Sequence, residues 1–270
     1  MPKLPRLPVS PISKALQTPP PRPGEGNGKV TALDHTQEAG ISVVDWVDER
    51  TSLSGAARWL MFRKVPKGTN WAYTLGSATM FAFLSQAVTG VFLAMYYRPD
   101  PSGGAYESIR YITNDVFLGQ FVRGMHKWGA SVMVVLVFLH MGRTFFWGAY
   151  KYPRELNWVI GVVLLILTML MSLTGYLLPF DQRAFWATTV ANNITATGPL
   201  VGPYLADFLR GGSEFGATTL SRFYAIHMLL VPGLIAALIG AHLYLVAKLG
   251  TTAPPWLNAE KVSELRETEI

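Results

Sequence analysis

The stretch RGMHKWGASVMVVLVFLHMGR, residues 123–143, decides the fold of this chain. It carries no charged residue from Trp128 to Gly142, and its two histidines, His126 and His140, are fourteen residues apart. In an α-helix, fourteen residues rise about 21 Å and complete almost four turns, so both imidazoles lie on nearly the same face. The stretch therefore predicts a membrane-crossing helix with one histidine toward each side.

A second uncharged stretch, residues 223–247, carries His227 and His242, fifteen residues apart. Ionisable residues are costly inside a membrane and are commonly functional. A lone histidine is more often a hydrogen-bonded structural residue, but two pairs on facing helices favour two bis-histidine haem sites stacked across a bilayer. Zinc or copper would need further close ligands, and none converge here.

The fifteen-residue spacing turns the second histidine about 100° away from the face that a fourteen-residue spacing would share. Pro232, five residues after His227, lacks a backbone donor and favours a kink. We hypothesise that a π-bulge near Pro232 absorbs the extra residue and restores the common face.

Two further uncharged runs, residues 68–97 and 156–180, exceed the roughly 20 residues that span hydrocarbon. Lipid tolerates only helices or closed barrels, and the period-two alternation of a barrel is absent. The expected fold is all-α, a four-helix transmembrane bundle within residues 70–250. Its spans are expected at about 70–97, 118–147, 156–178 and 222–249.

The segments outside the spans are expected to form two tails and short surface helices. Residues 1–50 are predicted to be a disordered or extended tail, and residues 251–270 a polar tail. Residues 51–69, which include SLSGAARWLMFRK at 52–64, predict an amphipathic helix on the bilayer surface, with a plain linker as the alternative. In the third connection, residues 185–190 and 200–209 are expected to form short surface helices.

Charge and cysteine content exclude several classes. Only 15% of residues are charged, against about 25% in soluble domains, and the net charge is +6. The basic residues cluster at span ends, which favours membrane lipid over nucleic acid. The positive-inside rule places both termini and the loop with Lys151 in the cytoplasm, as expected for a bacterial inner membrane protein. The chain has no Cys, which excludes disulfides and thioether-linked haem.

Glycines repeat the histidine interval. Gly76 and Gly90 are fourteen residues apart, as are Gly161 and Gly175. Glycine costs helix stability, so its presence in a helix interior needs a reason. Close helix packing is one reason. The shared interval favours another, that the glycines let flat porphyrins approach the backbone at two depths.

Basic residues flank the histidines. Arg123 lies three residues before His126 and Arg143 lies three after His140, so each shares a face with its histidine. Arginine binds carboxylates with two hydrogen bonds, which suits haem propionates. Arg222 and Lys248 fit this role less strictly. The alternative for all four is an ordinary interfacial residue.

Several motifs occur in the order typical of one family. The segments are TGVFLAMYY (89–97), RGMHKWGAS (123–131), FLHMGR (138–143), TGYLLPFDQRAFWATTV (174–190) and SRFYAIHMLLVP (221–232). The chain resembles the N-terminal, four-helix half of cytochrome b from quinol:cytochrome c oxidoreductases and cytochrome b–f complexes. Its fifteen-residue spacing resembles the split, b6-like type.

The resemblance implies two non-covalent haems b and their ligands. His126 with His227 would hold the outer, low-potential haem, and His140 with His242 the inner, high-potential haem. It also implies an outward quinol-oxidation pocket near the third connection. Candidate wall residues, each of which could instead face lipid or pack structurally, are Tyr176, Phe180, Phe185, Ala187 and Thr188.

The function implied by the resemblance is electron transfer in a Q-cycle, from quinol oxidation outside to quinone reduction inside. The family's Pro-Glu-Trp-Tyr motif is absent, so a separate subunit with the C-terminal half is expected. Further expected partners are a Rieske-type iron–sulfur protein and a cytochrome c-type subunit, in a dimeric complex without which the chain is inactive.

Two rival functions stay open at this point. One is a dihaem membrane anchor of a dehydrogenase or hydrogenase, against which the TGYLLPFDQRAFW segment argues. The other is a haem-free transporter or scaffold whose histidines relay protons.

Overall fold

A computed structural model describes residues 46–48, 50–51 and 68–256. The chain divides into two compact units, Met1–Arg63 and Lys64–Ile270. In the first unit, the described residues are helical. The amphipathic helix predicted at 51–69 lies almost entirely outside the described residues, as do most of the tails predicted at 1–50 and 251–270.

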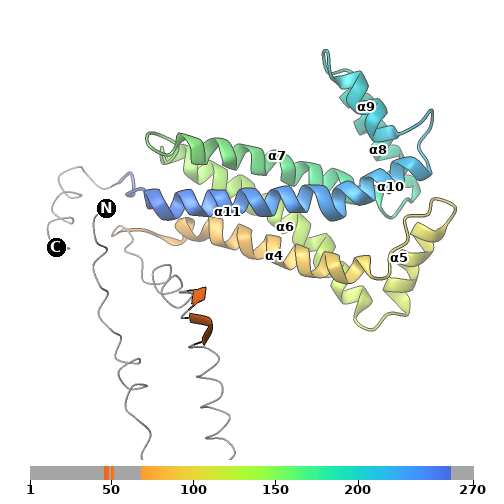
Figure 1. The fold of residues 1–270 in the computed structure, drawn as a ribbon, viewed down its shortest axis with the longest axis horizontal. Helices are drawn as coiled ribbons and strands as arrows, with labels where there is room; N and C mark the ends of the chain where they lie inside the picture. Colours follow the sequence, from red (N-terminus) through yellow and green to blue (C-terminus); the bar gives the residue numbers. More distant parts are fainter. Residues whose placement is uncertain (1–45, 49, 52–67, 257–270) are drawn as a thin grey trace, which may run out of the picture. The chain divides into compact units, whose positions relative to one another are not determined.

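In its described residues, the second unit contains four long helices, which can be followed in Figure 1. The first is α4, Leu75–Ala94, which follows the 3-10 turn η1, Trp71–Thr74. The second and third are α6, Gly119–Phe146, and α7, Glu155–Leu177. The fourth is continuous through α10, Ala217–Ala225, the π-helix η2, Ile226–Leu230, and α11, Val231–Leu249.

Each of the four is long and apolar enough to cross a membrane, and every regular element in the described residues is helical. The predicted all-α fold with four spans is therefore confirmed. The fourth helix begins at Ala217, earlier than expected. Large apolar side chains point away from the bundle, among them Phe81, Val88 and Leu229, which are 74%, 72% and 78% exposed. Such a surface suits lipid, while each helix satisfies its own backbone polar groups.

The four helices form two close pairs. α4 packs along α6, and α11 packs along α7, whereas the backbones of α6 and α11 make few close approaches. A cavity of about 160 Å³ lies between the two pairs, lined by residues of α4, α6, α7, η2 and α11. The cavity therefore lies between the helices that carry the histidines, at the level of His126 and His227.

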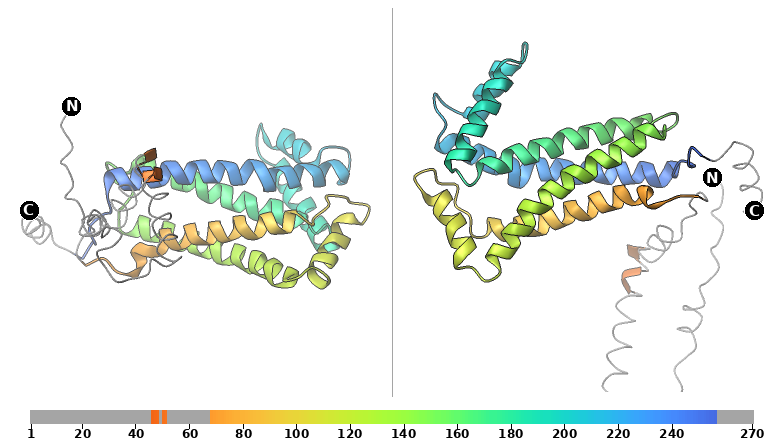
Figure 2. Two further views of the ribbon diagram at one scale, coloured as in Figure 1. Left: turned by 60° about the horizontal axis from the view of Figure 1, so that its bottom comes forward. Right: turned by 180° about the vertical axis from the view of Figure 1, so that it is seen from behind.

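Short helices gather at one end of the bundle. α5, Gly104–Asn114, joins α4 to α6, and α8, Gln182–Ala196, and α9, Gly202–Arg210, join α7 to α10. All lie at the end where α10 begins, as Figures 1 and 2 show. The helices predicted in the third connection are confirmed as α8 and α9, while α5 was not predicted.

The fourth helix contains the predicted irregularity. Residues Ile226–Leu230 form a π-helix that includes His227 and ends two residues before Pro232, and the backbone N–H of Val231 donates to the carbonyl of Ile226. A π turn takes up one more residue than an α turn. The π-bulge hypothesis is therefore confirmed, and both histidines of this helix face α6.

We predict that Pro232→Ala combined with deletion of Leu229 is tolerated. The deletion converts the π turn to an α turn, and alanine removes the clash that proline makes in a regular helix. The histidine spacing becomes fourteen residues, so the common face survives. Folded yield and thermal unfolding temperature in detergent measure the outcome.

The matched control is deletion of Leu139 in the regular helix α6. This deletion rotates His140 by about 100° relative to His126 and is expected to abolish folded protein. Equal loss of folded protein in both variants would contradict the idea that the π turn compensates for the fifteen-residue spacing of the histidines.

Candidate functional site

The four histidines meet as two pairs across the gap between α6 and α11. The His126 and His227 rings have centres 6.4 Å apart with an interplanar angle of 76°, and we call this pair site 1. The His140 and His242 rings have centres 6.3 Å apart at 80°, and this pair is site 2. Site 1 lies toward the α5 end of the bundle, and site 2 toward the opposite end.

The spacing of the rings suits a shared metal ion. A metal–imidazole bond is about 2 Å long, so two imidazoles that ligate one ion from opposite sides have ring centres roughly 6 Å apart. Both sites match this separation. At site 1, the cavity lined by His126 and His227 also leaves room for a flat group between the rings. The residues present therefore fit an iron porphyrin at site 1, and the ring spacing at site 2 fits a second one.

Each of the four repeated glycines lies against one imidazole. A Cβ added to Gly175 would be 2.5 Å from His227 Cε1, and one added to Gly76 would be 3.1 Å from His140 Cε1. The corresponding distances are 3.3 Å from Gly90 to His126 and 3.7 Å from Gly161 to His242. The glycines therefore leave room for the histidine rings themselves, a contact that the shared interval alone did not reveal.

Two threonines that sequence reasoning missed contact site 1. Thr89 Oγ1 lies 2.9 Å from His126 Nδ1, and Thr174 Oγ1 lies 3.1 Å from His227 Nδ1. Each threonine directly precedes one of the glycines, and the Thr-Gly pairs at 89–90 and 174–175 are a signal that could have identified both.

Site 2 is bordered by unpaired polar groups. Arg143 Nε and Nη2 are buried without a hydrogen-bond partner among the described residues. The Arg143 guanidinium lies over the Tyr73 ring, 3.8 Å from its centroid, and 4.7 Å from that of Trp147. Two buried guanidinium donors that lack an acceptor favour a bound anion, so Arg143 fits a carboxylate-bearing group next to His140.

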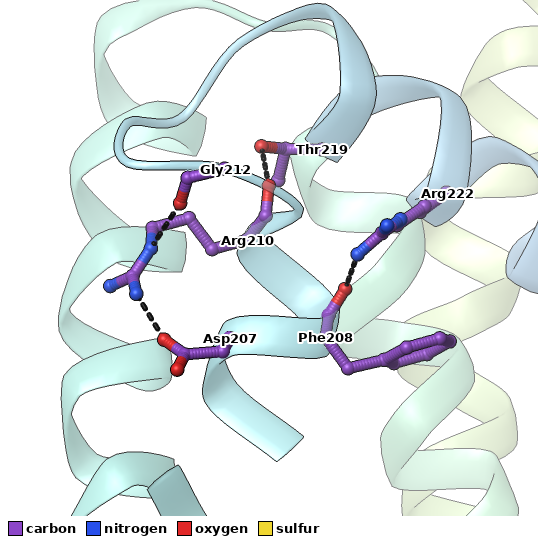
Figure 3. A network of polar contacts seen from close by, with 6 residues as sticks. All are labelled: Asp207, Phe208, Arg210, Gly212, Thr219 and Arg222. Atoms are coloured by element: carbon purple, nitrogen blue, oxygen red, sulfur yellow. Dashed lines mark hydrogen bonds and ion pairs between the residues drawn. The ribbon is translucent and has the colours of Figure 1, made fainter. Parts of the chain in front are cut away.

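The other predicted basic residues make protein contacts. Arg123 Nη1 donates to Thr113 Oγ1 at 3.4 Å, which joins α6 to α5. Lys248 lies 6.0 Å from the Tyr244 ring. Arg222 donates to the Phe208 carbonyl of α9 and lies over the Phe208 ring (Figure 3). In this structure Arg222 thus holds α9 against α10.

A polar network fixes the loop between α9 and α10, as Figure 3 shows. Arg210 pairs with Asp207 and donates to the Gly212 carbonyl at 2.8 Å. Thr219 donates to the Arg210 carbonyl and accepts from the Gly216 amide. The loop that leads into the fourth span is therefore held at both of its ends.

Tyr97 joins the ends of α4 and α7 near site 1. Its hydroxyl donates to the Leu178 carbonyl at 2.6 Å. Burial, reinforced by the neighbouring Tyr224, raises the pKa of the Tyr97 phenol. The hydroxyl therefore stays protonated and keeps its role as donor.

The five candidates for a quinol pocket lie on more than one surface. Phe185 contacts the rings of Phe180 and Phe215, with centroids 6.0 Å and 5.9 Å apart. Thr188 is buried, and its hydroxyl lacks a partner among the described residues. Tyr176 and Ala187 are exposed. The structure thus brings Phe180 and Phe185 together, but not all five residues.

Comparisons with known proteins agree with this geometry. Residues 60–250 match the family model described as Cytochrome b/b6/petB. The menaquinol:cytochrome c reductase cytochrome b subunit of Geobacillus thermodenitrificans is 43% identical over 218 residues, which cover 78% of this chain and 97% of the relative. Cytochrome b6 of Heliobacterium modesticaldum is 40% identical over 213 residues, 78% of this chain and 100% of the relative.

A solved structure is also similar. A chain of a hyperthermophilic respiratory Complex III superposes with a TM-score of 0.71 at 30% identity. The match covers 84% of this chain and 63% of that longer chain. The family match over most of the sequence, together with the paired histidines in a four-helix membrane bundle, shows that this integral membrane protein belongs to the cytochrome b/b6 family of haem-binding electron-transport proteins.

Proposed function

We propose that this chain is the dihaem cytochrome b subunit of a quinol oxidoreductase. The electron acceptor of that enzyme is a cytochrome c or a plastocyanin-like protein. The chain carries electrons across the membrane from an outer quinol-oxidation site to an inner quinone-reduction site. The observation that supports this most directly is the occurrence of two imidazole pairs, each with ring centres just over 6 Å apart, at two depths of one bundle.

The residues divide between the two sites. At site 1, His126 and His227 would hold the haem, and Gly90 and Gly175 make room for their rings. At site 2, His140 and His242 would hold the second haem, Gly76 and Gly161 adjoin them, and Arg143 would bind a propionate. When bound, the two haems supply one-electron carriers.

The protein holds the two sites at a fixed separation. Fourteen residues of α6 between His126 and His140 correspond to a rise of about 21 Å. Apolar helix faces line the cavity at site 1, with Met133 and Ile235 among them, and they exclude water from the ligand rings. Low polarity and fixed ligand geometry are the means by which a protein sets a haem potential.

The orientation follows from charge. Arg143 lies in the last turn of α6, and Lys151 and Arg154 lie between α6 and α7, all at the site 2 end. The positive-inside rule therefore places site 2 toward the cytoplasm and site 1 outward. Arg123, Arg222 and Lys248 stay candidates for propionate contacts.

The quinol is then oxidised near the start of α8, where Tyr176, Phe180, Phe185, Ala187 and Thr188 are the candidate residues. The proposed partners are a Rieske-type iron–sulfur protein, a cytochrome c-type subunit and a subunit with the C-terminal half of cytochrome b. The chain works within a dimeric complex.

Substitution of single histidines tests the ligand assignment. We expect His126→Leu and His227→Leu to remove the same haem, the one of lower potential, because one lost ligand opens the site. His140→Leu and His242→Leu should remove the other. Redox titration of the reduced-minus-oxidised spectrum of the purified complex distinguishes the two, and His35→Leu is a control outside the spans.

If two variants of one pair removed different haems, the pairing would be wrong. If none of the four changed the b-type spectrum, the haem assignment itself would be wrong.

The distances between the glycines and the imidazoles predict that alanine substitutions reduce haem occupancy to different extents. Gly175→Ala places a Cβ 2.5 Å from His227 Cε1, so the ring must move, and we expect loss of most of the haem at site 1. Gly161→Ala places its Cβ at an ordinary 3.7 Å from His242 Cε1, and we expect nearly full occupancy. Alanine favours a helix over glycine by about 1 kcal/mol, so helix propensity does not explain a loss.

Haem b per chain in the purified complex measures this effect. Gly233→Ala is the control, because nothing lies within 4 Å of its added Cβ. Equal losses in Gly161→Ala and Gly175→Ala would show that the glycines make room for the macrocycle rather than for the imidazoles.

A further inference from the structure

We infer that Thr89 and Thr174 are positioning residues that fix the imidazoles of site 1 and lower the redox potential of the haem held there relative to site 2. This inference rests on the proposed function, because it requires that His126 and His227 ligate a haem. The ring separations at the two sites are nearly equal and do not explain a difference in redox potential. The two threonines would be a structural cause of that difference.

The carbonyl oxygens beside each threonine decide which group donates toward the imidazole. Thr89 Oγ1 lies 2.7 Å from the Ser85 carbonyl oxygen, and Thr174 Oγ1 lies 2.8 Å from the Leu170 carbonyl oxygen. A carbonyl can only accept, so each threonine uses its one hydrogen on its own helix. Toward the imidazole the hydroxyl oxygen is then an acceptor, and the histidine Nδ1 must carry the hydrogen.

This assignment settles the tautomer of both rings. With Nδ1 protonated, Nε2 of His126 and of His227 keeps a free lone pair, the form that binds a metal ion. Thr89 is 6% exposed and Thr174 is fully buried, so water does not compete well for either contact. The two threonines therefore select the ligating tautomer before a cofactor enters.

Each threonine acts together with the glycine that follows it. Thr89 contacts Nδ1 of His126, and Gly90 leaves room beside Cε1 of the same ring. Thr174 likewise contacts Nδ1 of His227, and Gly175 leaves room beside Cε1 of that ring. One turn of α4 and one turn of α7 thus define the plane of one imidazole each.

Site 2 has a different arrangement. The glycines are preceded there by Leu75 and Ile160, and the acceptor recorded beside the His242 ring in the described ranges is the Asn157 backbone carbonyl, not a hydroxyl. In the same ranges, Thr144 donates to the His140 backbone carbonyl and not to the ring. Hydroxyl contacts to a ligand ring are therefore a feature of site 1.

The contacts have an electronic consequence. An acceptor on Nδ1–H makes the imidazole a stronger donor to the metal. A stronger donor stabilises the ferric more than the ferrous state, which lowers the reduction potential. Among the described residues, site 1 has two such contacts and site 2 has none from a hydroxyl, so the potential of a haem held at site 1 would be the lower of the two.

Threonine-to-valine variants of the purified complex test this, because valine keeps the shape and removes the hydroxyl. We expect Thr89→Val and Thr174→Val each to shift the lower-potential titration wave upward, and the double variant to shift it further. The higher-potential wave should stay in place. The low-spin ferric EPR signal of site 1 should shift, which a merely structural role would not require while the haem is retained.

Serine variants of the two threonines and a valine variant of a third threonine, Thr79, are the controls. Thr89→Ser and Thr174→Ser keep the hydroxyl and should restore the wild-type potential. Thr79→Val removes a comparable hydroxyl bond to the Leu75 carbonyl on α4, and it should change neither wave. Loss of the site 1 haem in the valine variants with retention in the serine variants would also support the inference.

Two results would overturn it. One is an unchanged lower-potential wave and EPR signal in the double valine variant. The other is equal haem loss in the serine and valine variants, which would mean that packing decides. Failure of the proposed function is a separate result, because the unsubstituted complex would then lack two b-type titration waves.

Discussion

The distance between facing imidazoles, 6.4 Å at one site and 6.3 Å at the other, is the constraint on which the rest of the structure depends. Two helices that each carry a histidine cannot pack tightly and also hold their rings this far apart across a metal ion. The bundle meets the constraint by packing α4 on α6 and α11 on α7 and leaving a gap between the pairs. Glycine at four positions then lets the neighbouring helices approach the rings.

The helix repeat sets the second constraint, because two sites must face the same gap. Fourteen residues in α6 achieve this without distortion. Fifteen residues in the fourth helix do not, and the π-helix at Ile226–Leu230 absorbs the difference. Its position beside Pro232 has a physical reason, since a widened turn relieves the carbonyl that a proline would otherwise meet.

Much of this was predictable from the sequence because it depends on periodicity. The spans, the histidine face, the glycine interval and the π-bulge all follow from counting residues along a helix. Contacts between helices do not follow in this way. The partners of Thr89 and Thr174 depend on side-chain directions across the bundle, and Arg222 donates to α9 because that helix folds back over α10. Helix α5 was missed because its residues 104–114 are mixed in polarity and short.

Haem content tests the central claim most directly. The amount of haem b per chain, measured as the pyridine haemochrome with quantified protein after purification of the complex, is predicted to be two, with both haems low-spin and non-covalent. A value of one, or a complete absence of b-type haem, would contradict the assignment of both imidazole pairs as axial ligands.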